Sequence, residues 1–263
     1  MVVAPDRAGR PGAFPQLEPP PDPGELGECP FCAGREDRTP PETLRLPAED
    51  GTWAVRVVPN LYPAFERQEV VVHAPHHARS LTELSSEALA LVAEAWRSRA
   101  GAAREEGFAY VHAILNEGQM AGSSLPHSHS QLIWLHKPPP AVAREGEMDA
   151  VPEGELVIEQ HGVVALCPAV STVPYELRVA PTEREPDAFA SPLLAPALDL
   201  AAGAIRRLRA VEPAAPVNLW LHDGPWWHLH LVPRLTVAAG IELGAGIHVN
   251  PLPPAEAAAR LRG

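Results

Sequence analysis

The order of predicted elements repeats along the chain, and this repetition limits the possible folds more than any single motif does. In the first half, β-rich segments broken by prolines predict strands, and a Ser/Thr-capped segment with apolar residues at helical spacing predicts a helix. These segments are strands at 53–65, 69–75, 108–118 and 130–137, with the helix at 80–107. The second half repeats the order, with strands within 162–181, a helix at 192–211, and strands at 217–224 and 226–233.

We interpret the repetition as one α+β unit used twice, giving half-domains at residues 1–150 and 151–263. The alternative is a chance similarity between two common strand–strand–helix–strand patterns. A chain of 263 residues is long enough to bury a sizeable core in either case. Proline-rich stretches at 15–27 and 138–140 predict extended connectors, because proline disfavours helices and inner strands.

Composition excludes several classes of protein. The formal net charge of −12 argues against a nucleic-acid-coating surface, which is normally basic. No apolar run approaches the roughly 18–20 residues that span a bilayer, and the N-terminus lacks the apolar core of a signal peptide. Three cysteines do not form a disulfide framework. We therefore expect a cytoplasmic, reduced protein that binds neither nucleic acid nor membrane.

Two of the cysteines form the motif Cys29-Pro-Phe-Cys32, which has the spacing to hold one tetrahedral ion. Thioredoxin-like redox pairs share this spacing, but they are expected at a strand-to-helix turn rather than in a Pro/Gly-rich connector. Two further zinc ligands are available from histidine-rich patches at 73–77 and 127–129. Within and near these patches, we interpret His73, His76 and His112 as surface residues. Cys167 is interpreted as a core thiol.

Two His-x-His pairs lie at the beginnings of predicted strands, at 127–129 and 228–230. Residues i and i+2 of a strand point to the same side, so each pair presents two imidazoles on one face. For the first pair, one histidine held by a metal would keep its neighbour oriented. The second pair could equally lie on a solvated strand face.

Six segments together resemble the galactose-1-phosphate uridylyltransferase family, a branch of the histidine-triad superfamily. They occur in the family's order and span nearly the whole chain: VVAPDRAGRP (2–11), ECPFCAGRE (28–36), VVPNLYPAF (57–65), APHHARSLTEL (74–84), NEGQMAGSSLPHSHSQ (116–131) and LHDGPWWHLHLVP (221–233). The resemblance implies two fused histidine-triad-like half-domains, with antiparallel sheets and helices on one face. It also implies a homodimer whose active site is completed by the neighbouring subunit.

The resemblance also implies roles for particular residues. His129 would be the nucleophile and Gln131 would bind the α-phosphate. Zinc would be held by Cys29, Cys32, His77 and His127, and a second zinc or iron by Glu145, His222, His228 and His230. The expected substrate-binding residues are Arg7, Arg10, Asn60, Asn116, Gly122, Ser124, Gln131 and Glu242, with backbone amides of the loop 121–124 facing phosphate oxygens.

The expected activity is transfer of a nucleoside monophosphate from a nucleotide sugar to a hexose 1-phosphate, through a covalent nucleotidyl-histidine. One departure from the family bears on the acceptor: Ile241 stands where uridylyltransferases carry a tyrosine that grasps the hexose. The form of this segment resembles the branch that includes plant ADP-glucose phosphorylase. A phosphorylase that uses inorganic phosphate is therefore the first alternative. A zinc-dependent hydrolase and a non-catalytic nucleotide-binding protein are the others.

Overall fold

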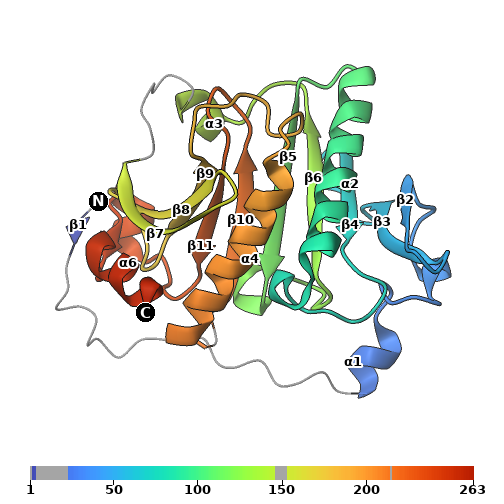
Figure 1. The fold of residues 1–263 in the computed structure, drawn as a ribbon, viewed down its shortest axis with the longest axis horizontal. Helices are drawn as coiled ribbons and strands as arrows, with labels where there is room; N and C mark the ends of the chain where they lie inside the picture. The colour runs from blue at the N-terminus through green and yellow to red at the C-terminus, as the bar shows by residue number, and fades with distance from the viewer. Residues whose placement is uncertain (1, 4–22, 146–152, 214) are drawn as a thin grey trace.

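The computed structural model describes residues 2–3, 23–145, 153–213 and 215–263. Within these ranges, ten strands form one antiparallel sheet in the order β2-β3-β4-β6-β5-β10-β11-β9-β8-β7 (Figure 1). Along that order the strands are β2 (Leu44–Pro47), β3 (Trp53–Pro59), β4 (Arg67–Val72), β6 (His129–Leu135), β5 (Tyr110–Glu117), β10 (Val217–His222), β11 (His228–Pro233), β9 (Leu177–Pro181), β8 (Val163–Pro168) and β7 (Gly154–Gln160). The short strand β1 (Val2–Val3) pairs in parallel with β12 (Val249–Asn250).

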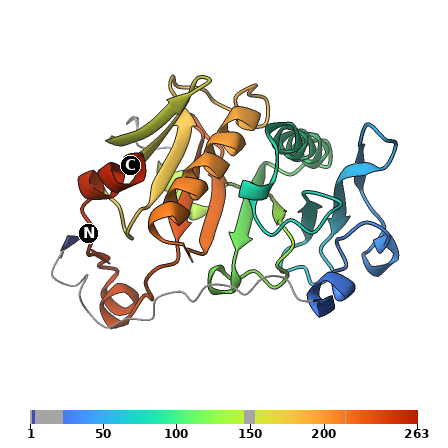
Figure 2. The same ribbon diagram turned by 60° about the horizontal axis from the view of Figure 1, so that its bottom comes forward.

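Three helices pack against the sheet. Helix α2 (Ser86–Glu105) contacts β2 to β6, α4 (Leu194–Val211) contacts β8, β9 and β11, and α6 (Pro254–Arg262) lies against α4, β7 and β8. The turned view in Figure 2 shows α2 and α4 side by side over the sheet. Shorter helices are α1 (Pro23–Glu28), α3 (Pro140–Glu145) and α5 (Gly240–Ala245), with 3₁₀ turns η2 (Glu36–Arg38), η3 (Leu81–Glu83) and η4 (Gln119–Ala121). None of the described helices is long and apolar enough to cross a membrane.

The strand order has the same pattern when it is read inward from either end of the sheet. From one end it runs β2, β3, β4, β6, β5, and from the other it runs β7, β8, β9, β11, β10. Each run holds three antiparallel strands, then a crossover through a long helix, then two more strands. The runs meet where β5 pairs with β10, for example Asn116 opposite Asn218. The α+β class and the antiparallel pairing are therefore confirmed, and the sheet is continuous rather than divided in two.

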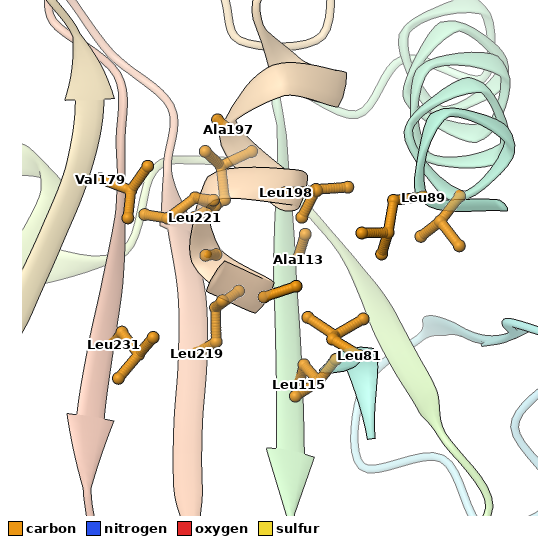
Figure 3. Close-up of a cluster of buried hydrophobic side chains, with 14 of the residues drawn as sticks. Leu81, Leu89, Ala113, Leu115, Val179, Ala197, Leu198, Leu219, Leu221 and Leu231 are labelled. Atoms are coloured by element: carbon orange, nitrogen blue, oxygen red, sulfur yellow. The ribbon is translucent and has the colours of Figure 1, made fainter. Parts of the chain in front are cut away.

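The hydrophobic core lies between the sheet and the helices, as Figure 3 shows for part of it. Alternation along each strand produces this arrangement, since every second side chain points toward α2 and α4. On β5, Ala113 and Leu115 are buried in the core, while Ile114 and Asn116 point to the opposite face. Leu219 and Leu231 bring the adjoining strands into the same core, each contributing about 2 kcal/mol by burial.

The predicted helix at 80–107 is two elements. Ser80 caps η3 by accepting the amide of Thr82, and α2 begins only after Ser85, which accepts the amide of Ala88. Two serine caps five residues apart therefore separate a 3₁₀ turn from the helix that follows. Strands β2 and β7 and helices α1, α3, α5 and α6 were not predicted. Helix α1 corrects the expectation of an extended connector at 15–27, because its first residue is Pro23 and proline is tolerated in the first turn of a helix.

Candidate active site and metal centre

The four predicted zinc ligands lie together on the sheet face opposite α2 and α4. Cys29 and Cys32 follow α1, His77 lies in the turn after β4, and His127 directly precedes β6. One ligand atom from each residue lies within 4.8 Å of the others. The Sγ of Cys29 is 3.3 Å from Nδ1 of His127, and the Sγ of Cys32 is 3.4 Å from Nδ1 of His77. Two thiolates and two imidazoles match the donor set of tetrahedral zinc, so this group could hold a metal ion.

Outer hydrogen bonds orient both histidines of the group. Nε2 of His77 lies 2.8 Å from the carboxylate of Glu25 in α1, and Nε of Arg79 donates to the same carboxylate at 2.7 Å. Nε2 of His127 donates to the carbonyl oxygen of Ala74 at 3.0 Å. Each ring therefore directs its Nδ1 lone pair toward the sulfurs, the arrangement that outer partners of metal-bound histidines normally enforce. The hydrogen bond from Arg79 is the largest cause of the lowered pKa of Glu25.

The pKa values of the proposed zinc ligands bear on whether the group can hold a cation. Burial lowers the pKa of His127 to about 4, so its imidazole is neutral at pH 7 and can act as a ligand. Burial and the adjacent Cys29 thiol raise the pKa of Cys32 to about 11. Two thiolates side by side in this environment require a positive charge between them.

His129 is the first residue of β6 and is 8% exposed. Its Nδ1 donates to the carbonyl oxygen of His127 at 2.7 Å. With the proton on Nδ1, the lone pair is on Nε2, which is the atom a nucleophilic imidazole uses. Burial lowers the pKa of His129 below its ordinary value, which keeps the ring neutral. The ring of Phe31 contacts its edge, with centroids 5.4 Å apart, and limits access of water on that side.

Gln131 lies on the same strand face as His129, two residues further along β6. Its Oε1 accepts hydrogen bonds from Gln68 at 2.6 Å and from Asn60 at 3.4 Å. The side-chain carbonyl of Gln131 is thereby engaged, which leaves its NH₂ group as the donor for a ligand. Gln68 was not predicted as a site residue, although its place two residues before the buried Val70 puts it on that face.

Asn116 on β5 is fixed in the same way as Gln131. Its Oδ1 accepts a hydrogen bond from Asn218 on β10 at 2.7 Å, so the amide nitrogen of Asn116 is its remaining polar group. Asn218 also donates to the carbonyl of Ala121 at 2.7 Å and so ties the small-residue loop to the sheet. The row of amides next to His129 therefore offers N–H donors, which suit an acceptor-rich ligand such as a phosphate ester.

The loop between β5 and β6 does not form the predicted cradle of amides. The N–H groups of Ala121 and Ser123 both donate to the carbonyl of Gly118, and that of Gly122 donates to Gln119. Gly122 has φ +87°, a left-handed conformation that favours glycine, and it ends η4. Ser124 is exposed at the loop surface. Three of the expected amide donors are thus used inside the loop.

A second group of histidines lies further along the same sheet face. Nε2 of His230 is 2.9 Å from Nε2 of His228 and 3.1 Å from Nδ1 of His222, so three ring nitrogens converge. The fourth predicted ligand, Glu145, ends α3, and its side chain lies outside the described part of the structure. His222 lies four residues along β10 from Asn218, which is level with Asn116, or about 13 Å at the strand rise. This second group is therefore remote from His129.

Among the histidines interpreted as surface residues, His76 is exposed, but the interpretation of His73 is wrong. His73 is 1% exposed and lies on the core side of the sheet. His112 is half-buried, and burial lowers its pKa to about 4. Cys167 is fully buried in the core, as predicted, and burial raises its pKa to about 12.

Comparison with known proteins tests the predicted resemblance. The sequence model of the family described as "Galactose-1-phosphate uridyl transferase, N-terminal domain" matches residues 62–139. An ADP-glucose phosphorylase of Arabidopsis thaliana is 28% identical, covering 100% of this chain and 89% of the relative. The predicted resemblance to the galactose-1-phosphate uridylyltransferase family is confirmed.

Solved structures of similar proteins share the fold over nearly the whole chain. An ADP-glucose phosphorylase from Arabidopsis thaliana with bound ADP-glucose gives a TM-score of 0.84 at 26% identity, covering 99% of this chain and 93% of that one. A GalT-like protein from Arabidopsis thaliana gives 0.81 at 25% identity, covering 99% and 94%. A uridylyltransferase gives 0.71 at 24% identity, covering 94% and 93%, which shows the common fold.

Three further residues predicted from the family pattern are Arg7, Arg10 and Glu242. Arg7 and Arg10 lie outside the described residues. Glu242 is in α5, where its carboxylate accepts the amide of Ala239 at 2.9 Å and closes the first turn of the helix. Ile241, at the position of the family's tyrosine, is 44% exposed.

Proposed function

We propose that the protein is a nucleotide-sugar phosphorylase that acts through a covalent intermediate on His129. Nε2 of His129 attacks the α-phosphorus of a nucleotide sugar such as ADP-glucose. The new N–P bond replaces the bridging P–O bond, and hexose 1-phosphate leaves with the electron pair. Inorganic phosphate then attacks the same phosphorus, releases His129 and forms the nucleoside diphosphate.

The observation that carries this proposal is the fixed tautomer of His129. A hydrogen bond to the carbonyl of His127 holds the proton on Nδ1, so the nucleophilic nitrogen is free on the face that also presents Gln131. A sugar phosphate is a good leaving group near neutral pH, so the reaction needs no strong general acid. The amide of Gln131, held by Gln68, supplies a donor to the α-phosphate as charge builds on its oxygens.

Similarity over the whole chain supports a phosphorylase better than a hexose-phosphate uridylyltransferase. The matched relatives include an ADP-glucose phosphorylase with 28% identity and a structure of such an enzyme with ADP-glucose bound. Ile241 is consistent with this choice, because it lacks the hydroxyl that would hydrogen-bond a hexose phosphate acceptor. Inorganic phosphate needs no contact to a sugar.

We further propose that zinc occupies the group of Cys29, Cys32, His77 and His127. Bound there, zinc would supply positive charge and rigidity to the segment beside the nucleophile. A second zinc or iron is proposed at His222, His228 and His230, with Glu145 as the fourth ligand. Because this second group is remote from His129, we assign it a structural role.

We propose that the two five-strand halves of the sheet belong to two histidine-triad-like half-domains. Their bounds are residues 1–150 and 151–263. We propose a homodimer in which Arg7 and Arg10 contact phosphate in the neighbouring active site, with Glu242 reaching a sugar hydroxyl. Sedimentation of a dilution series tests the dimer, since activity should track the dimer fraction. Full activity in a monomeric sample contradicts it.

Intact-mass spectrometry tests the function. The protein is incubated with ADP-glucose or UDP-glucose, and the mass of the adduct reports whether AMP or UMP is attached. His129→Ala should form no adduct and lose activity by on the order of 10³-fold or more. His76→Ala is the matched control, because its exposed side chain lies on a nearby loop, and it should keep full activity.

The acceptor is identified by comparing inorganic phosphate, glucose 1-phosphate and galactose 1-phosphate with each donor. Phosphorolysis of ADP-glucose is the expected preference. Undiminished turnover in His129→Ala would refute the covalent mechanism. An exclusive preference for UDP-glucose with galactose 1-phosphate would refute the phosphorylase assignment while keeping the nucleotidyl-histidine.

A further inference from the structure

A buried histidine lies directly behind the proposed nucleophile, on the core side of the sheet. His73 follows β4, and its ring sits between two serine hydroxyls of the neighbouring chain segment. Nδ1 of His73 is 2.9 Å from Oγ of Ser128, and Nε2 is 2.9 Å from Oγ of Ser130. Trp96 of α2 donates its indole N–H to Oγ of Ser130 at 2.8 Å. These four side chains form one buried hydrogen-bonded group, the His73 group.

The two serines are the residues immediately before and after His129. Because side chains alternate along a strand, the serines point into the core while His129 points to the site. One imidazole therefore holds the chain on both sides of the nucleophile. The backbone adds to this hold, since the amide of His73 donates to the carbonyl of Ser128. The orientation of the His129 backbone is therefore fixed by contacts on the core side of the sheet, opposite the face where the substrate would bind.

The second half of the sheet provides an internal comparison. Strand β9 pairs with β11 as β4 pairs with β6: Leu177 opposes Leu231 as Val71 opposes Ser130. In this comparison Val179 stands at the position of His73, Leu229 at that of Ser128, and Leu231 at that of Ser130. All three of these apolar side chains are fully buried. The half of the sheet without the nucleophile therefore forms the same strand pairing with apolar side chains at these three positions.

We infer that His73 is a positioning residue for His129, and that the His73 group is present for orientation of the nucleophile rather than for folding. The inference rests on the proposed function, in which Nε2 of His129 must lie in line with the bond that breaks. A displacement of about 1 Å in such an arrangement costs on the order of 100-fold in rate. Loss of the hydrogen bonds from His73 to the two serines should therefore slow the chemical step more than it weakens substrate binding.

The test compares His73→Val with the double variant His73→Val/Ser128→Ala. The single variant leaves the Ser128 hydroxyl in an apolar environment, so its melting temperature should fall. The double variant removes that hydroxyl and keeps the bond between Trp96 and Ser130, so most of the melting temperature should return. In both variants kcat for phosphorolysis should stay about 10- to 100-fold below wild type, with KM for the nucleotide sugar nearly unchanged.

A third variant keeps the test decisive if His73→Val does not fold. His73→Gln retains an amide that can reach Ser130, so it should fold and recover part of kcat. Recovery of kcat together with stability in the double variant would overturn the inference, as would a folded His73→Val with wild-type kcat. His76→Ala again serves as the control with unchanged kinetics.

A measurement that does not depend on turnover separates this inference from the proposed function. Nitrogen-15 NMR of the histidine side chains reports which nitrogen of His129 carries the proton. The expected result is a single Nδ1–H form in wild type and a mixture of both tautomers in the His73→Val/Ser128→Ala variant. A wild type that forms no nucleotidyl adduct would refute the proposed function alone. An unchanged single tautomer in the double variant would refute the positioning role.

Discussion

The buried ion pair between Glu117 and Arg209 joins the two halves of the molecule, and its removal should destabilise the fold in a measurable way. Glu117 ends β5 and its side chain is 3% exposed, while that of Arg209 in α4 is 27% exposed. One carboxylate oxygen accepts the amide of Leu81 at 2.8 Å and the other accepts Nη2 of Arg209 at 2.9 Å. Nη1 of Arg209 donates to Ser80 at 2.7 Å.

Glu117→Ala leaves a buried amide and a partly buried guanidinium without their acceptor. Breaking a buried pair costs roughly 3–5 kcal/mol, and we expect about 3 kcal/mol because water can reach Arg209. An unfolding entropy of about 2.1 cal/mol/K per residue gives about 0.55 kcal/mol/K for 263 residues. The melting temperature should therefore fall by about 5 °C.

A double-mutant cycle with Arg209→Ala, measured by urea unfolding, checks the reasoning. The double variant should be less destabilised than the sum of the single variants by about 2 kcal/mol, because it leaves no unpaired charge. Arg206→Ala is the matched control: it removes an exposed arginine from the same helix and should change stability by about 0.5 kcal/mol or less. A coupling energy near zero would show that the two side chains do not stabilise each other.

Three further outcomes are expected. Removal of the proposed zinc with a chelator, or Cys32→Ser, should lower the melting temperature strongly, since structural zinc contributes roughly 10 kcal/mol or more; unchanged melting in verified metal-free protein would count against the site. Gly154→Ala should destabilise β7, because its Cβ would lie 2.3 Å from the carbonyl oxygen of Cys167, and an unaltered unfolding midpoint would contradict this. Cys167, whose pKa of about 12 keeps the thiol protonated, should resist alkylation at pH 8 until the protein unfolds; peptide mass mapping would reveal the opposite.

The elements around the site could be predicted because several independent signals agree there. The spacing of Cys29 and Cys32, the paired histidines and the strand patterns all place ligands on strand ends or adjoining turns. Both edge strands were missed, since β2 has only four residues and β7 follows a proline- and glycine-containing stretch. Helix α6 has the pattern of a short amphipathic helix, but it lies at the end of the chain beyond the repeated unit.

Partners of the site residues could not be predicted, because they depend on strand register. Gln68 reaches Gln131 only because β4 pairs with β6, and Glu25 reaches His77 from a helix 52 residues earlier. His73 shows a different kind of error. A histidine that ends the run Val70-Val-Val is placed in the core by alternation from Val71, and its polar character led to the opposite interpretation. Alternation was the more reliable signal.

The continuous hydrogen-bonded seam between β5 and β10 also determines how the molecule can move. Hinge closure requires a flexible connection between two bodies, whereas here backbone hydrogen bonds and a shared core cross the boundary between the halves. Rotation of one half against the other therefore cannot control access of a ligand to His129, and any such control must come from loops. Amide protons of β5 and β10 should exchange with solvent only on global unfolding, so the boundary between the halves should be the last part of the sheet to open.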